Sequence, residues 1–294
     1  MLWLIGCKGM LGTEIARQFT ENKIDFVGTD IDVDITNPQA LADFAKGKKI
    51  THIINCSAYT AVDKAESDAD FAKKLNEDGP RNIANLANQI HAVMIHISTD
   101  YVFDGTGTSP YTEDIPIAPI GVYGKTKAAG EAAVRQNLKE YYIIRTAWLY
   151  GWAGKNFVYT MIRAINTHDS VKVVNDQKGS PTFAGDLADV ILKIINKKTV
   201  PYGTYHCTDL GEITWWDFTN EIKKQGIESG LITNKNCVVN PCTTSEYPTP
   251  AKRPAYSVLC KDKIQNALGI TLPDWKQSLK KFIYSPLFDK SRIM

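Results

Sequence analysis

Apolar runs alternate with amphipathic stretches through the first half of the chain. The apolar runs are bounded by glycine, aspartate or serine, and they span residues 2–6, 24–30, 50–56, 93–98 and 141–146. Short apolar runs with such boundaries are typical of strands that are buried on both faces of a parallel sheet. The pattern therefore predicts five strands of this kind.

Three stretches between these runs have apolar residues at helical spacing, over residues 10–22, 38–46 and 76–90. Strands and helices in regular alternation predict an α/β fold of the Rossmann type, with a doubly wound parallel sheet.

The pattern is less regular after about residue 150. Residues 157–167, 183–196 and 215–226 have helical spacing, whereas 240–254 is rich in proline, threonine and serine and is typical of a loop. We expect a dinucleotide-binding domain over residues 1–147, to which residues 183–200 return. The remainder, residues 148–182 and 201–294, is expected to form a smaller α/β substrate-binding domain.

Charge and composition exclude several classes of partner. The formal net charge is only +2, and basic and acidic residues are mixed along the chain, so we expect neither nucleic acid nor an anionic membrane as a partner. The first apolar run is too short for a signal peptide, and no other run approaches the length of a membrane span. We expect a soluble, cytoplasmic protein. The six cysteines have no zinc-binding spacing and are expected to be reduced thiols.

The first strand is followed directly by a glycine-rich turn. Gly6, Gly9 and Gly12 surround Met10 and Leu11 at the point where the first helix begins. Glycines allow a backbone to approach a pyrophosphate, and the start of a helix offers it unpaired N–H groups. The spacing differs from that of the common dehydrogenase motif, so its position after the strand carries the prediction of a dinucleotide site.

Acidic residues end the second predicted strand. Asp30 lies at the distance along the chain where a carboxylate accepts hydrogen bonds from the adenosine ribose, which favours NADH. A simple turn at Asp30 is the alternative. Asp34 and Ile35, a few residues further on, are expected to line the adenine edge.

Tyr123 and Lys127 form a Tyr-x-x-x-Lys pattern. Residues four apart share one face of a helix, so the phenol and the ammonium can act on one substrate. We expect the cation to lower the pKa of Tyr123, which then donates a proton to a carbonyl oxygen as hydride arrives from a nicotinamide cofactor.

Two predicted strands end in small polar residues at the edge where doubly wound sheets bind ligands. The fourth strand ends in Ser98 and Thr99, and either hydroxyl suits a hydrogen bond to the substrate carbonyl or to the tyrosine. The third strand ends before Ser57, Ala58 and Tyr59, which leave room for the cofactor.

Several of these motifs together resemble the extended short-chain dehydrogenases/reductases and, within them, the dTDP-4-dehydrorhamnose reductases. The resemblance covers residues 1 to about 282, and it is carried by the glycine turn and by residues 58–66 (AYTAVDKAE), 98–105 (STDYVFDG), 122–131 (VYGKTKAAGE), 145–150 (RTAWLY), 175–182 (NDQKGSPT) and 247–254 (YPTPAKRP).

The resemblance implies a role for each matching residue. The catalytic residues of the family correspond to Tyr123, Lys127 and Thr99, which favours Thr99 over Ser98. The cofactor contacts correspond to the residues already named in the glycine turn, at Asp30, Asp34 and Ile35, and at residues 57–59. Substrate contacts correspond to Thr99, Asp100 and Trp148. Arg253 is suited to a diphosphate, although a surface arginine is the alternative there.

The resemblance also implies a reaction. It is the reduction of the C4 ketone of dTDP-4-dehydro-β-L-rhamnose by NADPH or NADH, the last step of dTDP-rhamnose biosynthesis, which serves cell-surface polysaccharides. Another nucleotide-sugar reductase or epimerase, or a non-catalytic regulatory relative, is the alternative. Some family members dimerise through Mg²⁺, but the sequence offers no strong set of ligands, so no metal ligand is assigned and a homodimer is left open.

Overall fold

A six-stranded parallel sheet forms the centre of the molecule. The computed structural model describes residues 1–197 and 199–293. The strand order is β10-β5-β4-β3-β1-β2, and every pairing in the sheet is parallel. The strands are β1 (Leu2–Ile5), β2 (Phe26–Thr29), β3 (His52–Asn55), β4 (Val93–Thr99), β5 (Tyr141–Thr146) and β10 (Gly203–His206). The expected Rossmann-type α/β fold is confirmed.

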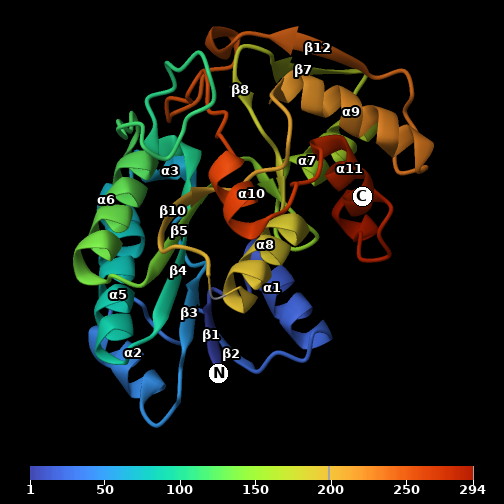
Figure 1. The fold of residues 1–294 in the computed structure, drawn as a ribbon. Coiled ribbons are helices and arrows are strands. Elements are labelled where there is room, and N and C mark those ends of the chain that lie inside the picture. Colours follow the sequence, from blue (N-terminus) through green and yellow to red (C-terminus); the bar gives the residue numbers. More distant parts are fainter. Residues whose placement is uncertain (198, 294) are drawn as a thin grey trace.

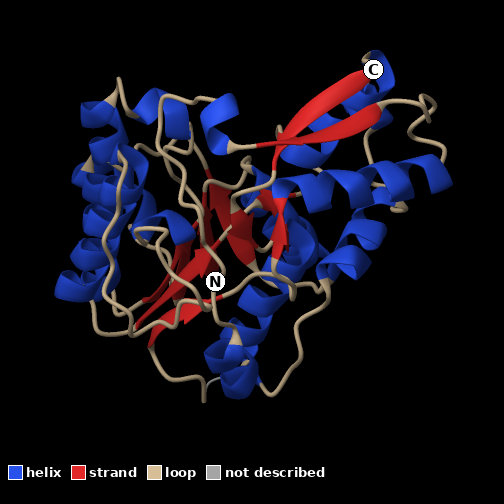
Figure 2. Ribbon diagram, turned by 90° about the horizontal axis from the view of Figure 1, so that it is seen from above, coloured by secondary structure: helices blue, strands red, loops and turns tan. Residues whose placement is uncertain are grey.

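Helices cover both faces of this sheet, as Figures 1 and 2 show. One face packs against α2 (Pro38–Ala45), α5 (Gly79–Gln89) and α6 (Val122–Asn137). The other packs against α1 (Met10–Glu21), α8 (Ala184–Asn196) and α10 (Asp262–Leu268). Each helix presents an apolar stripe to a sheet that is apolar on both sides, and this explains why the strands read as continuous apolar runs.

Short elements follow β3 and β4 at the carboxyl edge of the sheet. They are α3 (Val62–Ala65), α4 (Ala69–Lys73), the π-helix η1 (Lys74–Asp78) and the 3₁₀ turn η2 (Asp100–Val102). Since all six strands run in the same direction, the loop after each strand opens at this one edge. The predicted site residues Ser57, Thr99 and Trp148 follow β3, β4 and β5 there.

A second, smaller cluster of apolar side chains lies beyond that edge. It is built from α7 (Phe157–Thr167), α9 (Trp215–Glu228) and α11 (Trp275–Ile283). Three two-stranded sheets accompany these helices: β6 (Leu149–Tyr150) with β9 (Thr182–Phe183), β7 (Ser170–Val174) with β12 (Val238–Cys242), and β8 (Lys178–Gly179) with β11 (Ile213–Thr214). The 3₁₀ turns η3 (Thr244–Glu246) and η4 (Lys290–Ile293) complete the fold.

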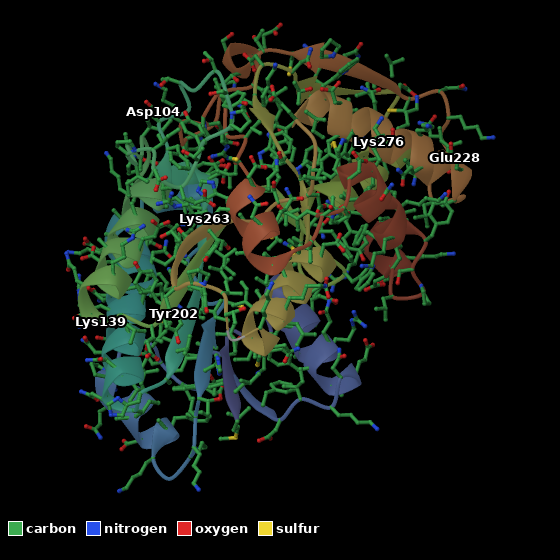
Figure 3. All side chains as sticks on the ribbon, in the orientation of Figure 1. Asp104, Lys139, Tyr202, Glu228, Lys263 and Lys276 are labelled. Carbon is green, nitrogen blue, oxygen red and sulfur yellow. The ribbon has the colours of Figure 1, made fainter. Side chains whose placement is uncertain are left out.

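Two details of the second half differ from expectation. Residues 240–242 belong to β12 rather than to a loop, and β12 pairs in parallel with β7 although it contains Pro241. Proline cannot donate to a sheet, but it is tolerated on an edge, and β12 has only one neighbour. The strand β10 was not predicted. It joins the edge of the main sheet beside β5, where Lys263 of α10 donates from Nζ to the Thr204 carbonyl over 2.8 Å (Figure 3).

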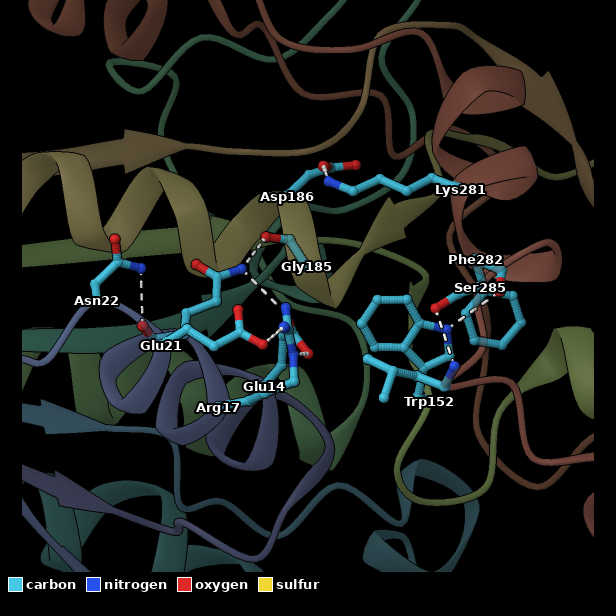
Figure 4. Close-up of polar contacts among 12 residues, drawn as sticks. Glu14, Arg17, Glu21, Asn22, Trp152, Gly185, Asp186, Lys281, Phe282 and Ser285 are labelled. Carbon is cyan, nitrogen blue, oxygen red and sulfur yellow. Dashed lines mark hydrogen bonds and ion pairs between the residues drawn. The ribbon is translucent and has the colours of Figure 1, made fainter.

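Polar contacts join α1 to α8 on the main sheet, join α8 to α11 of the smaller cluster, and hold the smaller cluster together. Gln18 of α1 donates to the Gly185 carbonyl at the start of α8 over 2.8 Å, and Lys281 of α11 pairs with Asp186 over 3.0 Å (Figure 4). The indole N–H of Trp152 donates to the Phe282 carbonyl over 3.1 Å. Within the described residues, no helix is both long and apolar enough to cross a membrane.

Candidate active site

The glycine turn connects β1 to α1 and lies against the end of β3. Gly6 has a φ of 79°, which is a left-handed conformation, and a Cβ placed there would lie 2.8 Å from the Ser57 backbone nitrogen. Only glycine fits both constraints. No side chain caps α1 within the described residues, so its first backbone N–H groups are left for an anion such as a pyrophosphate.

Asp30 lies at the end of β2 and faces the glycine turn. Its two carboxylate oxygens accept hydrogen bonds from the backbone N–H groups of Lys8 and Ile31, each over 3.0 Å. These bonds fix the carboxylate beside the turn, the position that a ribose-binding acid needs.

The other residues predicted to contact the adenosine differ in what they expose. Asp34 accepts hydrogen bonds from the backbone and hydroxyl of Thr36, both over 2.8 Å. The side chain of Ile35 is buried in the core against α5, and the side chain of Leu11 is buried between α1 and the main sheet. Ile35 and Leu11 therefore offer a ligand their backbone rather than their side chains.

The segment after β3 is tied to the helix that carries Tyr123. Asn76 in η1 accepts from the Tyr59 backbone N–H over 2.8 Å and donates to the Tyr59 carbonyl and the Thr126 hydroxyl, each over 3.1 Å. Ser57 donates from its backbone and hydroxyl to Asn55. Asn76 thus holds the predicted cofactor segment, residues 57–59, against α6.

Helix α6 begins beside α3 and passes close to η2. Glu66 accepts a hydrogen bond from the Val122 backbone N–H over 2.9 Å and so caps the helix. A Cβ at Gly124 would lie 2.2 Å from the Tyr101 carbonyl oxygen, so a glycine is required for this approach. The rings of Tyr101 and Tyr123 meet edge to face at 5.5 Å. These contacts fix the position of Tyr123 at the carboxyl edge of the sheet.

Thr99 and Tyr123 lie together at the ends of β4 and α6. Burial raises the pKa of Tyr123 to about 12, and a hydrogen bond with the Thr99 side chain lowers it. This corrects the expectation that Lys127 lowers the pKa of the phenol: burial raises that pKa, and the group that opposes burial is Thr99. At neutral pH Tyr123 is therefore a protonated phenol, the form that donates a proton.

Lys127 lies one helical turn after Tyr123 and is almost completely buried, with 2% of its surface exposed. Its Nζ donates to the Ile97 carbonyl oxygen over 2.6 Å. Burial lowers the pKa of Lys127 to about 8, while the charge of Glu131 raises it. The ammonium thus lies between the end of β4 and the end of β3, where the predicted cofactor segment begins.

The structure separates the two candidate hydroxyls at the end of β4. Ser98 donates to the buried carboxylate of Glu131 over 2.6 Å, on the face covered by α6. The Thr99 hydroxyl donates to Asp100 over 2.9 Å, and it is near enough to the Tyr123 phenol to lower the pKa of that group. Only Thr99 is placed for a direct part in proton transfer.

Asp100 is buried next to Thr99. Burial raises the pKa of its carboxyl to about 6, and the nearby hydroxyls of Ser257 and Thr99 oppose that rise. Its Oδ2 atom has no partner of hydrogen-bonding geometry among the described residues. A buried acceptor without a partner is rare, and it is suited to a polar group of a ligand.

Trp148 follows β5 with a φ of 46°, which is unusual for a bulky residue. Its indole stacks on that of Trp215 with centroids 3.6 Å apart and planes inclined by 12°. Strained backbone is frequent at binding sites, because the surrounding structure must hold it in place. Trp148 and Trp215 form a stacked aromatic pair that joins the end of β5 to the start of α9.

Arg253 lies in the loop that leads back from β12 toward the main sheet. Its Nη2 donates to Asp63 of α3 over 2.9 Å, and Asp63 also accepts from the Ala251 backbone N–H over 3.2 Å. The Nη1 atom is buried and has no hydrogen-bond partner among the described residues. Burial raises the pKa of Tyr101, and the charge of the Arg253 guanidinium lowers it.

Comparison with known proteins decides the family. A model of the family described as "RmlD substrate binding domain" matches residues 1–287. The chain belongs to the RmlD family. It is 39% identical to the dTDP-4-dehydrorhamnose reductase of Escherichia coli K12 over 292 residues, which cover 95% of this chain and 96% of the relative. It is 40% identical to a probable dTDP-4,6-dihydroxy-2-methyloxan-3-one 4-ketoreductase of Streptomyces antibioticus over 96% of this chain and 94% of that one.

Solved structures of the RmlD family have the same fold. A dTDP-4-dehydrorhamnose reductase of Clostridium acetobutylicum is 46% identical, with a TM-score of 0.90 over 96% of this chain and 98% of that one. Another, from Bacillus anthracis in complex with NADP, is 36% identical, with a TM-score of 0.88 over 96% and 97% of the two chains.

Four residues that contribute to this RmlD-family site were not predicted: Asp63, Glu66, Glu131 and Trp215. Asp63, Glu66 and Glu131 lie inside motifs that carried the resemblance, but a carboxylate in a motif does not reveal which helix end or arginine it bonds. Trp215 opens α9, where its aromatic character was consistent with a core position. Within residues 1–197 and 199–293, no three His, Cys, Asp or Glu side chains are grouped as metal ligands would be.

Proposed function

We propose that this protein reduces the C4 ketone of dTDP-4-dehydro-β-L-rhamnose to give dTDP-β-L-rhamnose, with NADPH or NADH as the reductant. The observation that carries the proposal is the meeting of Thr99, Tyr123 and Lys127 at the carboxyl edge of the sheet. Relatives that share nearly the whole chain bear the name of this activity.

The proposed roles follow from the contacts. Tyr123 is protonated at neutral pH and gives its proton to the ketone oxygen, and the Thr99 hydroxyl orients that oxygen and the phenol. Lys127 binds the nicotinamide ribose from its place between β3 and β4. Bound NAD(P)H supplies the hydride that reduces the C4 carbon. Solvent then returns a proton to Tyr123.

The residues for binding the cofactor fit a dinucleotide. The start of α1 offers backbone N–H groups through Met10, Leu11 and Gly12, next to Gly6 and Gly9. Asp30 is held beside this turn, where it suits the adenosine ribose, with Asp34 and Ile35 beyond it. Residues 57–59 border the space next to Lys127.

The substrate is proposed to lie between the main sheet and the smaller cluster. Among the described residues, Asp100 has an unpaired buried oxygen for a sugar or base group and Arg253 has an unpaired N–H group for the diphosphate, while Trp148 offers an aromatic surface to the deoxysugar. Asp100 follows the end of β4, and Trp148 follows the end of β5, at the same edge of the sheet.

A different dTDP-ketosugar is the second candidate substrate, because one relative at 40% identity is named as a ketoreductase of another dTDP-sugar. The experiment is a turnover panel with dTDP-4-dehydro-β-L-rhamnose, other dTDP-4-ketosugars, and NADPH and NADH, with the product identified by NMR. We expect the highest kcat/KM with dTDP-4-dehydro-β-L-rhamnose. Faster reduction of another ketosugar would identify that sugar as the substrate instead. Failure to reduce any of the ketosugars would refute the proposed function.

The expected cytoplasmic localisation stays a prediction, and the question of a homodimer stays open. Fractionation of cells and light scattering of the purified protein check them directly.

A further inference from the structure

The carboxylate of Glu131 is the centre of a buried polar network behind the proposed proton donor. The side chain is fully buried, and it accepts four hydrogen bonds. Ser98 donates over 2.6 Å, Arg145 donates from Nε and Nη2 over 2.8 Å each, and Arg135 donates over 2.6 Å. The network joins β4, β5 and α6, and it contacts none of the residues proposed to bind substrate.

Two neighbouring side chains of α6 bind two consecutive residues of β4. Lys127 donates to the Ile97 carbonyl, and Glu131, one turn later, accepts from the hydroxyl of Ser98. The next residue of the strand is Thr99. The two bonds together fix the register between α6 and β4, so they fix where Lys127 lies relative to Thr99.

We propose that Glu131 is a positioning residue for the reduction: it clamps α6 to the end of β4 and holds Lys127 in its charged form beside the cofactor. This inference rests on the proposed function, in which Lys127 binds the nicotinamide ribose.

The charged groups around Lys127 support the second part of the proposal. Glu131 raises the pKa of Lys127 and so opposes the effect of burial. Cys56, at the end of β3, has a pKa raised to about 12 by burial and stays a neutral thiol. His96 on β4 is buried and has a pKa well below its usual value, so it is neutral as well.

Two arginines and a tyrosine complete these surroundings. Arg145 of β5 and Arg135 of α6 both pair with Glu131, and Tyr123 is a neutral phenol. The carboxylate of Glu131 is therefore the anion that favours the ammonium of Lys127, while the two arginines weaken its field.

A purely structural role is a weak explanation for this network. Burying an ion pair costs about as much in desolvation as it returns, and apolar side chains of similar volume fill such a site equally well. The charge of Glu131 has a consequence beyond packing only if it acts on a neighbouring group that titrates. That group is Lys127.

The test uses two substitutions that change the field at Lys127 in opposite directions. Glu131→Gln removes the negative charge and keeps one oxygen, which can still accept from Ser98 and from Nε of Arg145. Arg135→Gln removes a positive charge from a side chain that is 33% exposed, so this variant is expected to fold. Arg17→Gln is the matched control, because Arg17 is 32% exposed and pairs with the buried Glu14 one turn earlier on α1.

The measurements are the pH profile of kcat/KM with NADPH and dTDP-4-dehydro-β-L-rhamnose, and the pH profile of the NADPH dissociation constant from fluorescence. For the wild type we expect kcat/KM to fall as pH rises through about 8, where Lys127 loses its charge. Glu131→Gln should move this fall to lower pH by about one unit or more, since an opposite charge nearby favours the charged form. Arg135→Gln should move it to higher pH, and Arg17→Gln should leave it in place.

Profiles of Glu131→Gln and Arg135→Gln that coincide with the wild type would overturn the proposal, even if both variants were slower. If Glu131→Gln does not fold, the upward shift in Arg135→Gln decides alone, and its absence overturns the proposal. If the wild type binds NADPH but reduces no dTDP-ketosugar, the proposed function fails, and the NADPH binding profiles still decide the role of Glu131.

Discussion

Two segments border the site as its walls, and contacts of different kinds hold each of them in place. The wall that carries Tyr123 and Lys127 is the junction of α6 with β4, where Glu131 is fully buried and accepts four hydrogen bonds. The wall that carries Arg253 is a loop, and its ion pair with Asp63 has side chains that are 21% and 43% exposed. Proton transfer needs fixed geometry, whereas a loop is suited to changes of substrate.

The first prediction compares the stability of the two walls. Replacing Glu131 by alanine leaves the buried Arg145 charge without its partner, and we expect a loss of about 3–5 kcal/mol in the free energy of unfolding. Replacing Arg253 by alanine should cost only about 0–1 kcal/mol, because partly exposed pairs contribute little. Urea unfolding of both variants measures the difference. Equal losses would remove the distinction between the walls.

The second prediction concerns binding at the loop. Arg253→Ala should raise KM for the dTDP-sugar by about 10- to 100-fold, since a hydrogen bond to a charged group contributes about 1.5–3 kcal/mol. The values of kcat and of the NADPH dissociation constant should change little. Lys252→Ala is the control, because Lys252 is adjacent and exposed. A KM unchanged in Arg253→Ala would place the diphosphate elsewhere.

The third prediction has the smallest effect and concerns the far end of the cofactor. Removing the Asp30 carboxylate by Asp30→Ser should increase the ratio of kcat/KM for NADPH over NADH by about tenfold, because a carboxylate next to the ribose repels a 2′-phosphate. Asp25→Ser, at the other end of β2, should leave the ratio unchanged. A ratio that does not move in Asp30→Ser shows that Asp30 is only a turn residue.

The sequence predicted the regular strands and helices better than the strands that pair at sheet edges. The strands over 93–98 and 141–146 and the helix over 157–167 were located to within a residue, because buried parallel strands form continuous apolar runs and amphipathic helices have a strong periodic pattern. The strands β10 and β12 were missed. Both are short and depend on pairing with distant residues, and Pro241 gave β12 the composition of a loop.

The site shows the same limit. The pattern of Tyr123 and Lys127 revealed a helical pair, and the resemblance then favoured Thr99. The sequence did not reveal that burial raises the pKa of Tyr123, since that depends on residues from η2 and β4 that pack around it. Nor did it reveal that Glu131 meets Arg145, a contact between residues of different elements.

The substitution Tyr123→Phe tests directly whether Tyr123 is the proton donor, because it removes the hydroxyl and leaves the ring that packs against Tyr101. Turnover of dTDP-4-dehydro-β-L-rhamnose and NADPH binding are measured on the same preparation. If Tyr123 is the proton donor, we expect kcat to fall by about 10²- to 10⁴-fold while the NADPH dissociation constant stays near that of the wild type. A Phe variant that reduces the sugar at the wild-type rate would contradict it.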